Sequence, residues 1–164
     1  MAEAARIQTH VMDIEPQAVP KKEKSAFICS KDTLDGAYPS LVLAINARRL
    51  GMEATIFYTF MGLNVIRKNG AKKCKFIPAG VLGAIPGMAS FATWMMKKKI
   101  EKANIPEIEE LIEMAQLEGV KFVACQMTLD MMELTVDDLI EGVEVQTAEE
   151  FLKYAKDCNV SLFT

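Results

Sequence analysis

Apolar and polar residues alternate in blocks along this chain, and the blocks predict strands separated by helices. Residues 26–29 form a short apolar run that ends in the polar segment 30–32, as expected of a buried first strand. β-Branched and aromatic residues fill 54–60, which predicts the second strand. Further strands are predicted for 120–127, 143–145 and 160–163.

Helical spacing of apolar residues fills most of the intervals between these strands. The segment 41–50 has this spacing and Gly51 can close it; Thr33 is a plausible cap at its start, although Pro39 fits best in a first helical turn. Short or amphipathic helices are also predicted for 62–69, 106–119, 136–140 and 148–157, the last two preceded by the capping pairs Thr135/Asp138 and Thr147/Glu150. Repeated strand–helix–strand units predict a three-layer α/β/α fold with a mainly parallel sheet of about five strands.

Length and charge narrow the class of protein. The 164 residues fit one domain, which we place at 25–164, preceded by a flexible tail at 1–24. A net charge of −3 and the lack of a basic stripe with aromatics argue against a nucleic-acid partner. The N-terminus has no apolar signal region, so a cytoplasmic protein is expected.

Cysteine and histidine usage argues against a metal site. The four cysteines form no Cys-x-x-Cys pair, and the one histidine, His10, falls in the predicted tail. Unpaired cysteines suit a reducing compartment. No glycine motif matches a dinucleotide or phosphate loop, so we expect neither a metal nor another cofactor.

Cys125 is the candidate reactive residue, because it ends an apolar strand just before a short helix. Parallel α/β sheets place their chemistry at such junctions, and helix N-terminal amides favour a thiolate. The alternative is a packed cysteine, since free cysteine is among the most buried residue types. Met127 and Met131 would line a pocket beside the thiol or serve in the core.

An insertion at about 70–100 contains the uncharged segment 79–96. A membrane-spanning helix needs about twenty such residues, but glycines and Pro86 make the first half a poor helix. We therefore favour a flexible apolar flap, or a surface buried between subunits, over a membrane-spanning helix. Peripheral contact of this segment with a membrane is a third possibility.

The insertion is expected to begin at the same edge of the sheet as Cys125. The Cys125 site would then be within reach of Lys72, Lys73, Cys74 and Met88. The positive charge of the lysines would favour a thiolate, and Cys74 would resolve an oxidised or sulfurated Cys125. In the alternative interpretation the lysines are solvated and Cys74 packs in the core.

Several motifs together resemble those of the DsrE/DsrF-like proteins. In chain order they are Ser30-Lys31-Asp32-Thr33-Leu34-Asp35 with Ala37-Tyr38-Pro39, Ile56-Phe57-Tyr58-Thr59-Phe60, Gly83-Ala84-Ile85-Pro86-Gly87-Met88, Met95-Met96-Lys97-Lys98-Lys99, Ala124-Cys125-Gln126-Met127 and Asp137-Asp138-Leu139-Ile140-Glu141-Gly142-Val143. The resemblance covers residues 25–164, and the apolar Gly-Pro-Met insertion is typical of one branch of the family.

The resemblance implies a flavodoxin-like fold without flavin, a homo-oligomer (dimer, trimer or hexamer) and a role in sulfur trafficking. It makes Cys125 the sulfurtransferase or sulfur-carrier residue, which accepts sulfane sulfur as a persulfide and passes it to a partner such as a TusA-type carrier. Where many members have Arg-Gly after the cysteine helix, this chain has Glu133-Leu134, which leaves partner and substrate open. Association with membranes is also implied for some members.

Two other functions compete with sulfur transfer. The first is a thiol redox protein, peroxidase-like or a sensor, in which Cys125 becomes a sulfenic acid that Cys74 resolves. The second is a noncatalytic oligomeric scaffold whose apolar insertion docks a membrane or a partner.

Overall fold

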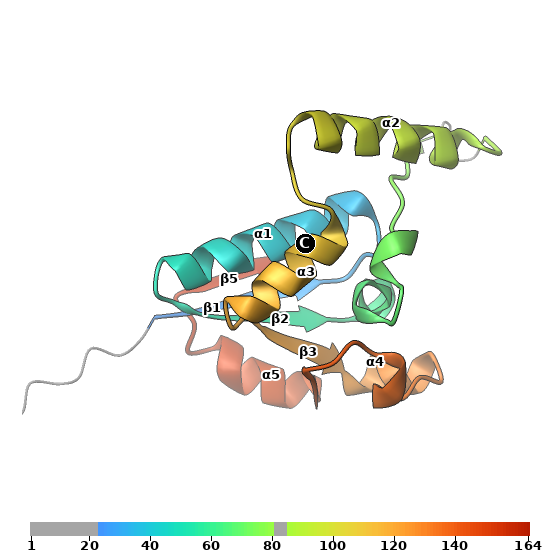
Figure 1. The fold of residues 1–164 in the computed structure, drawn as a ribbon. Coiled ribbons are helices and arrows are strands. Elements are labelled where there is room, and N and C mark those ends of the chain that lie inside the picture. The colour runs from blue at the N-terminus through green and yellow to red at the C-terminus, as the bar shows by residue number, and fades with distance from the viewer. Residues whose placement is uncertain (1–22, 81–84) are drawn as a thin grey trace, which may run out of the picture.

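A parallel five-stranded sheet forms the centre of the molecule (Figure 1). The structure is a computed structural model that describes residues 23–80 and 85–164; the predicted tail up to residue 22 and the insertion residues 81–84 lie outside these ranges. The strand order is β4-β3-β2-β1-β5, and every neighbouring pair is parallel. The strands are β1 (Lys24–Cys29), β2 (Glu53–Tyr58), β3 (Lys121–Cys125), β4 (Val143–Gln146) and β5 (Val160–Phe163).

Helices cover both faces of this sheet, which confirms the predicted α/β class. The α-helices are α1 (Leu34–Arg49), α2 (Met88–Lys102), α3 (Ile108–Leu117), α4 (Gln126–Met131) and α5 (Ala148–Ala155). Helices α1 and α3 pack on one face, α5 packs on the other, and α4 follows the end of β3 (Figure 1). The strand order differs from that of flavodoxin itself. In flavodoxin β1 lies between β2 and β3, whereas in this protein β1 lies between β2 and β5.

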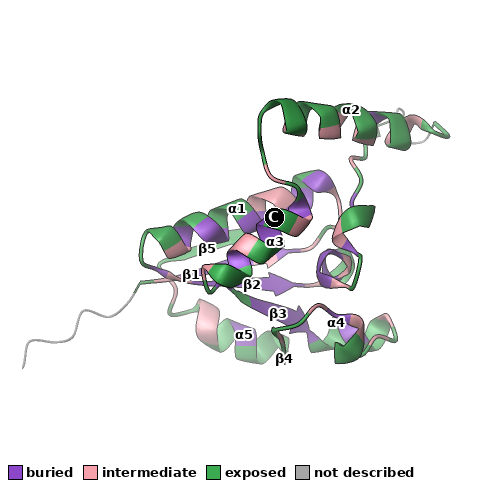
Figure 2. Cartoon of the chain, viewed as in Figure 1, coloured by how far each residue is buried: buried purple, intermediate pink, exposed green. Residues whose placement is uncertain are grey.

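Successive residues of a strand contribute to different parts of the core, which forms two clusters, one on each face of the sheet. In β3, Phe122 and Ala124 belong to the larger cluster beneath α1 and α3, whereas Val123 and Cys125 belong to the smaller cluster beneath α5. Successive side chains of a strand point to opposite faces, so this division follows from the backbone. Figure 2 shows the buried strands between helices whose outer faces are exposed.

Helix α1 begins earlier than Pro39 would suggest. Thr33 is its N-cap residue, and Pro39 lies inside the helix instead of in its first turn. Leu34, Ala37 and Leu41 are buried, so packing on the sheet keeps the segment before the proline helical.

Two of the short predicted helices are 3₁₀ helices. The segment predicted as a helix at 62–69 is η1 (Phe60–Ile66), and the one predicted at 136–140 is η4 (Val136–Asp138). A third 3₁₀ turn, η2 (Ala71–Lys73), follows η1. The predicted capping boxes are both present: Thr135 pairs with Asp138, and Thr147 pairs with Glu150.

The described part of the insertion forms the arm, which we define as 85–102 and which consists mainly of α2. The arm stands out from the body of the molecule in Figures 1 and 2, and Ala92 is the one buried residue of α2. Phe91, Trp94 and Met95 are exposed on it. Among the residues that the structure describes, no helix has both the length and the apolar character needed to cross a membrane.

Candidate functional site at the end of strand β3

Cys125 is the last residue of β3, and α4 begins at the next residue. It lies opposite Gln146 of β4, at the carboxyl edge of the sheet, which is the edge where the parallel strands end. Ligands of open parallel sheets bind outside this edge. The predicted strand–cysteine–helix junction is therefore present, with Cys125 in the N-cap position of a six-residue helix.

The Cys125 side chain is 2% exposed and belongs to the smaller apolar cluster. Its buried companions there are Ala26, Phe57, Val123 and Phe151, and the rings of Phe57 and Phe151 stack with centroids 4.3 Å apart. These surroundings exclude water from the thiol. A reagent reaches the sulfur only after a local movement of the residues that cover it.

A buried threonine ties the β3–α4 junction to the end of β2. The Phe60 backbone N–H donates to Thr128 Oγ1 at 3.1 Å, and the Thr59 and Thr128 hydroxyl oxygens are 3.3 Å apart. Phe60 has a φ of 47°, a left-handed conformation that is uncommon outside glycine and that often occurs at functional sites. The sequence placed Phe60 in a predicted strand and in a family motif, but it did not predict the contact between Phe60 and Thr128, because nothing in the local pattern signals a contact over this separation.

Exposed apolar side chains gather on the two segments that this threonine joins. Phe60 and Met61 follow β2, and Met127 and Met131 lie on α4; all four are about half exposed or more, and Met127 reaches 64%. We call these four residues the edge patch. Met127, a predicted accessory residue, thus lies two residues after Cys125 on an accessible surface, and exposed apolar groups of this kind mark interaction sites.

Cys74 lies on the opposite face of the sheet from Cys125. It belongs to the larger cluster beneath α1 and α3, and its thiol faces the Gly70 carbonyl oxygen at 3.9 Å. Burial, with the nearby Asp32 carboxylate, raises the pKa of Cys74 to about 12, so the thiol stays protonated. The structure therefore does not bring Cys74 to the Cys125 site, and it supports the interpretation in which Cys74 packs in the core.

The lysines of η2 also lie away from Cys125. Lys72 forms an ion pair with Glu109 of α3 at 3.4 Å, and Lys73 lines a small cavity together with Cys74. Met88 is the first residue of α2, on the arm that stands out from the body of the molecule, whereas α4 follows the end of β3 in the body (Figure 1). The expectation that these residues reach Cys125 was wrong. Their position after β2 shows at which edge of the sheet they lie, but it does not show on which face of the sheet they pack.

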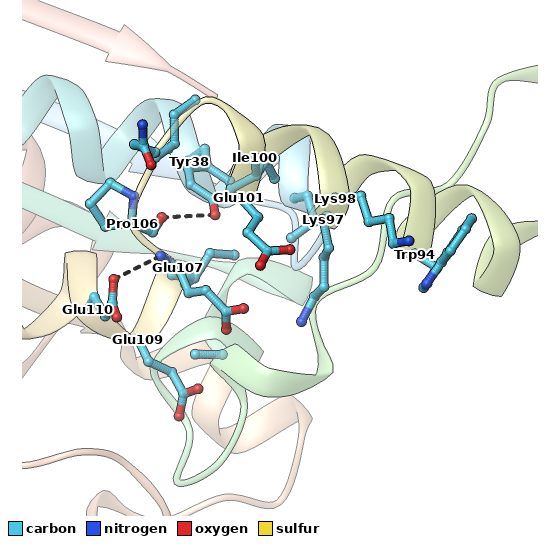
Figure 3. Close-up of a pocket in the computed structure, with 15 residues that line it drawn as sticks. Tyr38, Trp94, Lys97, Lys98, Ile100, Glu101, Pro106, Glu107, Glu109 and Glu110 are labelled. Carbon is cyan, nitrogen blue, oxygen red and sulfur yellow. Dashed lines mark hydrogen bonds between the residues drawn. The ribbon is translucent and has the colours of Figure 1, made fainter.

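A cavity of about 610 Å³ also lies away from Cys125. It separates the arm from the start of α3, with Trp94 and Lys97 on one side and Glu107 and Glu110 on the other (Figure 3). The Tyr38 hydroxyl donates to the Pro106 carbonyl oxygen at 3.0 Å in its wall. Within residues 23–80 and 85–164 no group of three or more His, Cys, Asp or Glu side chains is placed to hold a metal ion.

These features define an α/β protein with a buried thiol at the carboxyl edge of its sheet. Residues 21–163 match the DsrE/DsrF/DrsH-like family, and the chain belongs to that family, as its motifs indicated.

Two relatives are similar to this chain in sequence, and two solved structures share its fold. The sulfur carrier protein DsrE2 of Allochromatium vinosum is 36% identical, over 87% of this chain and 99% of its own length. The uncharacterized protein YrkE of Bacillus subtilis is 30% identical, over 86% and 96%. The crystal structure of the ychN protein from E. coli shares the fold with a TM-score of 0.58 and 14% identity, covering 88% of this chain and all of that chain. Protein MTH1491 of Methanobacterium thermoautotrophicum has a TM-score of 0.51 and 18% identity, over 86% of this chain and 99% of its own.

Proposed function

We propose that this chain is a sulfur-trafficking protein that accepts sulfane sulfur as a persulfide on Cys125 and passes it to a partner protein. The observation that carries the proposal is the position of Cys125 between β3 and α4 at the carboxyl edge. Family membership and the 36% identity to a sulfur carrier protein support it.

The chemistry that we propose needs one thiolate. The Cys125 thiol loses its proton, and the Sγ atom attacks the terminal sulfur of a donor persulfide. A new S–S bond forms at Cys125, the donor S–S bond breaks, and the donor leaves as a thiolate that takes up a proton. The exchange transfers one sulfur atom without net oxidation, and it is repeated in reverse with the acceptor.

The environment of Cys125 suits this exchange in two respects. The apolar cluster keeps water from the sulfane sulfur once it is bound, which protects a reactive intermediate. The edge patch gives a partner, such as a TusA-type carrier, an apolar surface beside the junction. Entry of the donor requires α4 and its neighbours to move, because the thiol is almost completely buried.

We further propose that the protein is a homo-oligomer. The arm leaves Phe91, Trp94 and Met95 exposed in the single chain, and a second copy would cover them. Contact of this surface with a membrane is the alternative that the same exposed residues allow.

Loading with sulfur tests the central proposal. The reduced protein is incubated with a persulfide donor, and its intact mass is measured beside that of Cys125→Ala. We expect the wild type to gain the mass of one sulfur atom and the variant to gain none. Equal gain in both proteins would refute the assignment of Cys125.

A parallel incubation with hydrogen peroxide separates transfer from the thiol redox function. Modification of Cys125 by peroxide alone, without loading by the donor, would favour a redox role. The structure gives that role less support, because Cys74, its proposed resolving residue, lies on the other face of the sheet.

A further inference from the structure

A small cavity at the carboxyl edge, on the face opposite to Cys125, carries an excess of positive charge. It has a volume of about 230 Å³, and we call it the basic cavity. Its wall includes three cationic residues, one carboxylate and one amide: Arg67, Lys68, Lys73, Asp32 and Asn64. It thus lies after the ends of β1 and β2, in the part of a parallel sheet where ligands bind.

Arg67 is held in place by a chain of two hydrogen bonds. Its Nη1 atom donates to Asn64 Oδ1 at 3.3 Å, and Asn64 Nδ2 donates to Asp32 Oδ2 at 3.0 Å. These two bonds fix the orientation of the Asn64 amide and position the side chain of Arg67, a half-buried residue. An arginine has five N–H donors, so most of them remain for another acceptor.

The three cations are not neutralised by ion pairs within the described chain. The ion pairs formed there join Arg49 to Glu118, Lys72 to Glu109 and Lys153 to Glu149. Lys68 instead donates to the Asp137 carbonyl oxygen at 2.5 Å, which is a neutral group.

Two carboxylates lie close enough to reduce this charge. Asp32 accepts from Asn64, and Asp138, whose pKa is lowered first by its bonds to Thr135, is also influenced by Arg67 and Lys68. Three cations against two carboxylates leave the basic cavity with a positive balance. A partly buried arginine that forms no ion pair suits an oxoanion, because the planar N–H donors of its guanidinium pair with the oxygens of the anion.

We propose that the basic cavity is a binding site for a small, doubly charged tetrahedral oxoanion. Its volume lies below the range of about 300–1,000 Å³ that is usual for larger ligands, which suits a small anion. Arg67 supplies fixed donors, while Lys68 and Lys73, which are both exposed, add positive charge to the wall. Thiosulfate, sulfate and hydrogen phosphate share the chemistry that this site recognises.

Calorimetric titration tests the site, with each of these three anions as its own arm and potassium chloride holding the ionic strength constant. We expect saturable binding of at least one of them. Arg67→Gln and Lys73→Gln should each weaken it about tenfold, because a charge-assisted hydrogen bond or a contact charge is lost. Asp32→Asn should tighten binding by removing the opposing carboxylate.

Lys156→Gln is the matched control, because Lys156 is an exposed lysine beyond α5 and outside the basic cavity. It should bind like the wild type. If Arg67→Gln does not fold, the test rests on Lys73→Gln, which should fold because Lys73 is exposed. No saturable binding of any of the three anions, or equal binding by Lys73→Gln and Lys156→Gln, would overturn the proposal.

Cys125→Ala separates this proposal from the proposed function. The variant should bind the anion with unchanged affinity while failing to load sulfur, since the two sites lie on opposite faces of the sheet. Preference for thiosulfate over sulfate would connect the anion to sulfur supply, and equal affinity for all three would support a general oxoanion site.

Discussion

Thr128 is the residue on which the geometry of the β3–α4 junction depends. Its buried hydroxyl accepts the Phe60 N–H, so Thr128→Val leaves that N–H without its partner. We expect a loss of about 1–3 kcal/mol in the free energy of unfolding, measured by urea denaturation. Thr128→Ser, which keeps the hydroxyl, is the control and should lose clearly less. Equal stability of Thr128→Val and wild type would show that the bond is not important.

Tyr58 gives a prediction for alkaline pH. Its hydroxyl is fully buried and has no hydrogen-bond partner among the described residues, and burial raises its pKa well above the usual 10.0. The folded state keeps this proton at a pH where the unfolded state releases it. The free energy of unfolding therefore falls as the pH rises above 10.

Tyr58→Phe should remove that part of the alkaline loss. At neutral pH it should also raise the free energy of unfolding by about 1 kcal/mol, because an unpaired buried hydroxyl is costly. Denaturant unfolding at neutral pH and above pH 10 measures both effects. A variant that loses as much stability above pH 10 as the wild type would contradict the prediction. Cys74, with its pKa raised to about 12, should continue to cause alkaline loss in both proteins.

The outcome for the two cysteines shows what the sequence can and cannot indicate at this scale. The apolar run before Cys125 and the helix after it were enough to place this residue at the carboxyl edge. Cys74 follows a 3₁₀ turn and has no strand register of its own, so its face was not predictable. The sequence indicated correctly that both segments follow strands at the carboxyl edge of the sheet. It did not indicate on which face of the sheet Cys74 lies, because that depends on packing with α3.

At the scale of elements, the close approach of η1 to β1 depends on Gly62. A Cβ atom at this position would lie 2.1 Å from the Cys29 carbonyl oxygen, and its next neighbours, Cys29 C and Ser30 N, are also backbone atoms, which cannot move aside as the end of a flexible side chain can. We expect Gly62→Ala to lower the free energy of unfolding by about 3 kcal/mol, as for severe overpacking.

Gly142→Ala provides the control for this substitution. Gly142 has a φ of 79° but its nearest neighbouring atom would be 3.8 Å from the new Cβ, so this variant measures backbone strain alone, about 1 kcal/mol. Urea denaturation compares the two. A Gly62→Ala protein no less stable than Gly142→Ala would contradict the packing of η1 against β1.

Elements with strong local signals were predicted, and those that depend on tertiary contacts were not. The strands β1, β2 and β5 and the helix α3 agree with their apolar patterns to within a few residues. The helix expected at 62–69 is a 3₁₀ helix, because the chain tightens to pass beside β1 at Gly62. No periodic pattern reports such a constraint.

At the scale of the whole molecule, the arm makes the proposed oligomer testable. The rings of Phe91 and Trp94 lie 5.9 Å apart and are both more than half exposed. Replacing both by serine should reduce the mass found by light scattering, since the apolar contact with a second copy is lost. Leu117→Ser, which changes an exposed leucine at the end of α3 and outside the arm, should leave the mass unchanged. A double variant with the wild-type mass would contradict the role of the arm.

The central claim, that Cys125 carries the sulfur, is tested most directly by locating the added sulfur atom. The loaded protein is alkylated, digested and examined by tandem mass spectrometry, so that all four cysteines are compared in one sample. We predict a persulfide on the peptide that contains Cys125, with Cys29, Cys74 and Cys158 carrying none. A persulfide on any of those three residues while Cys125 remains a free thiol would contradict the account.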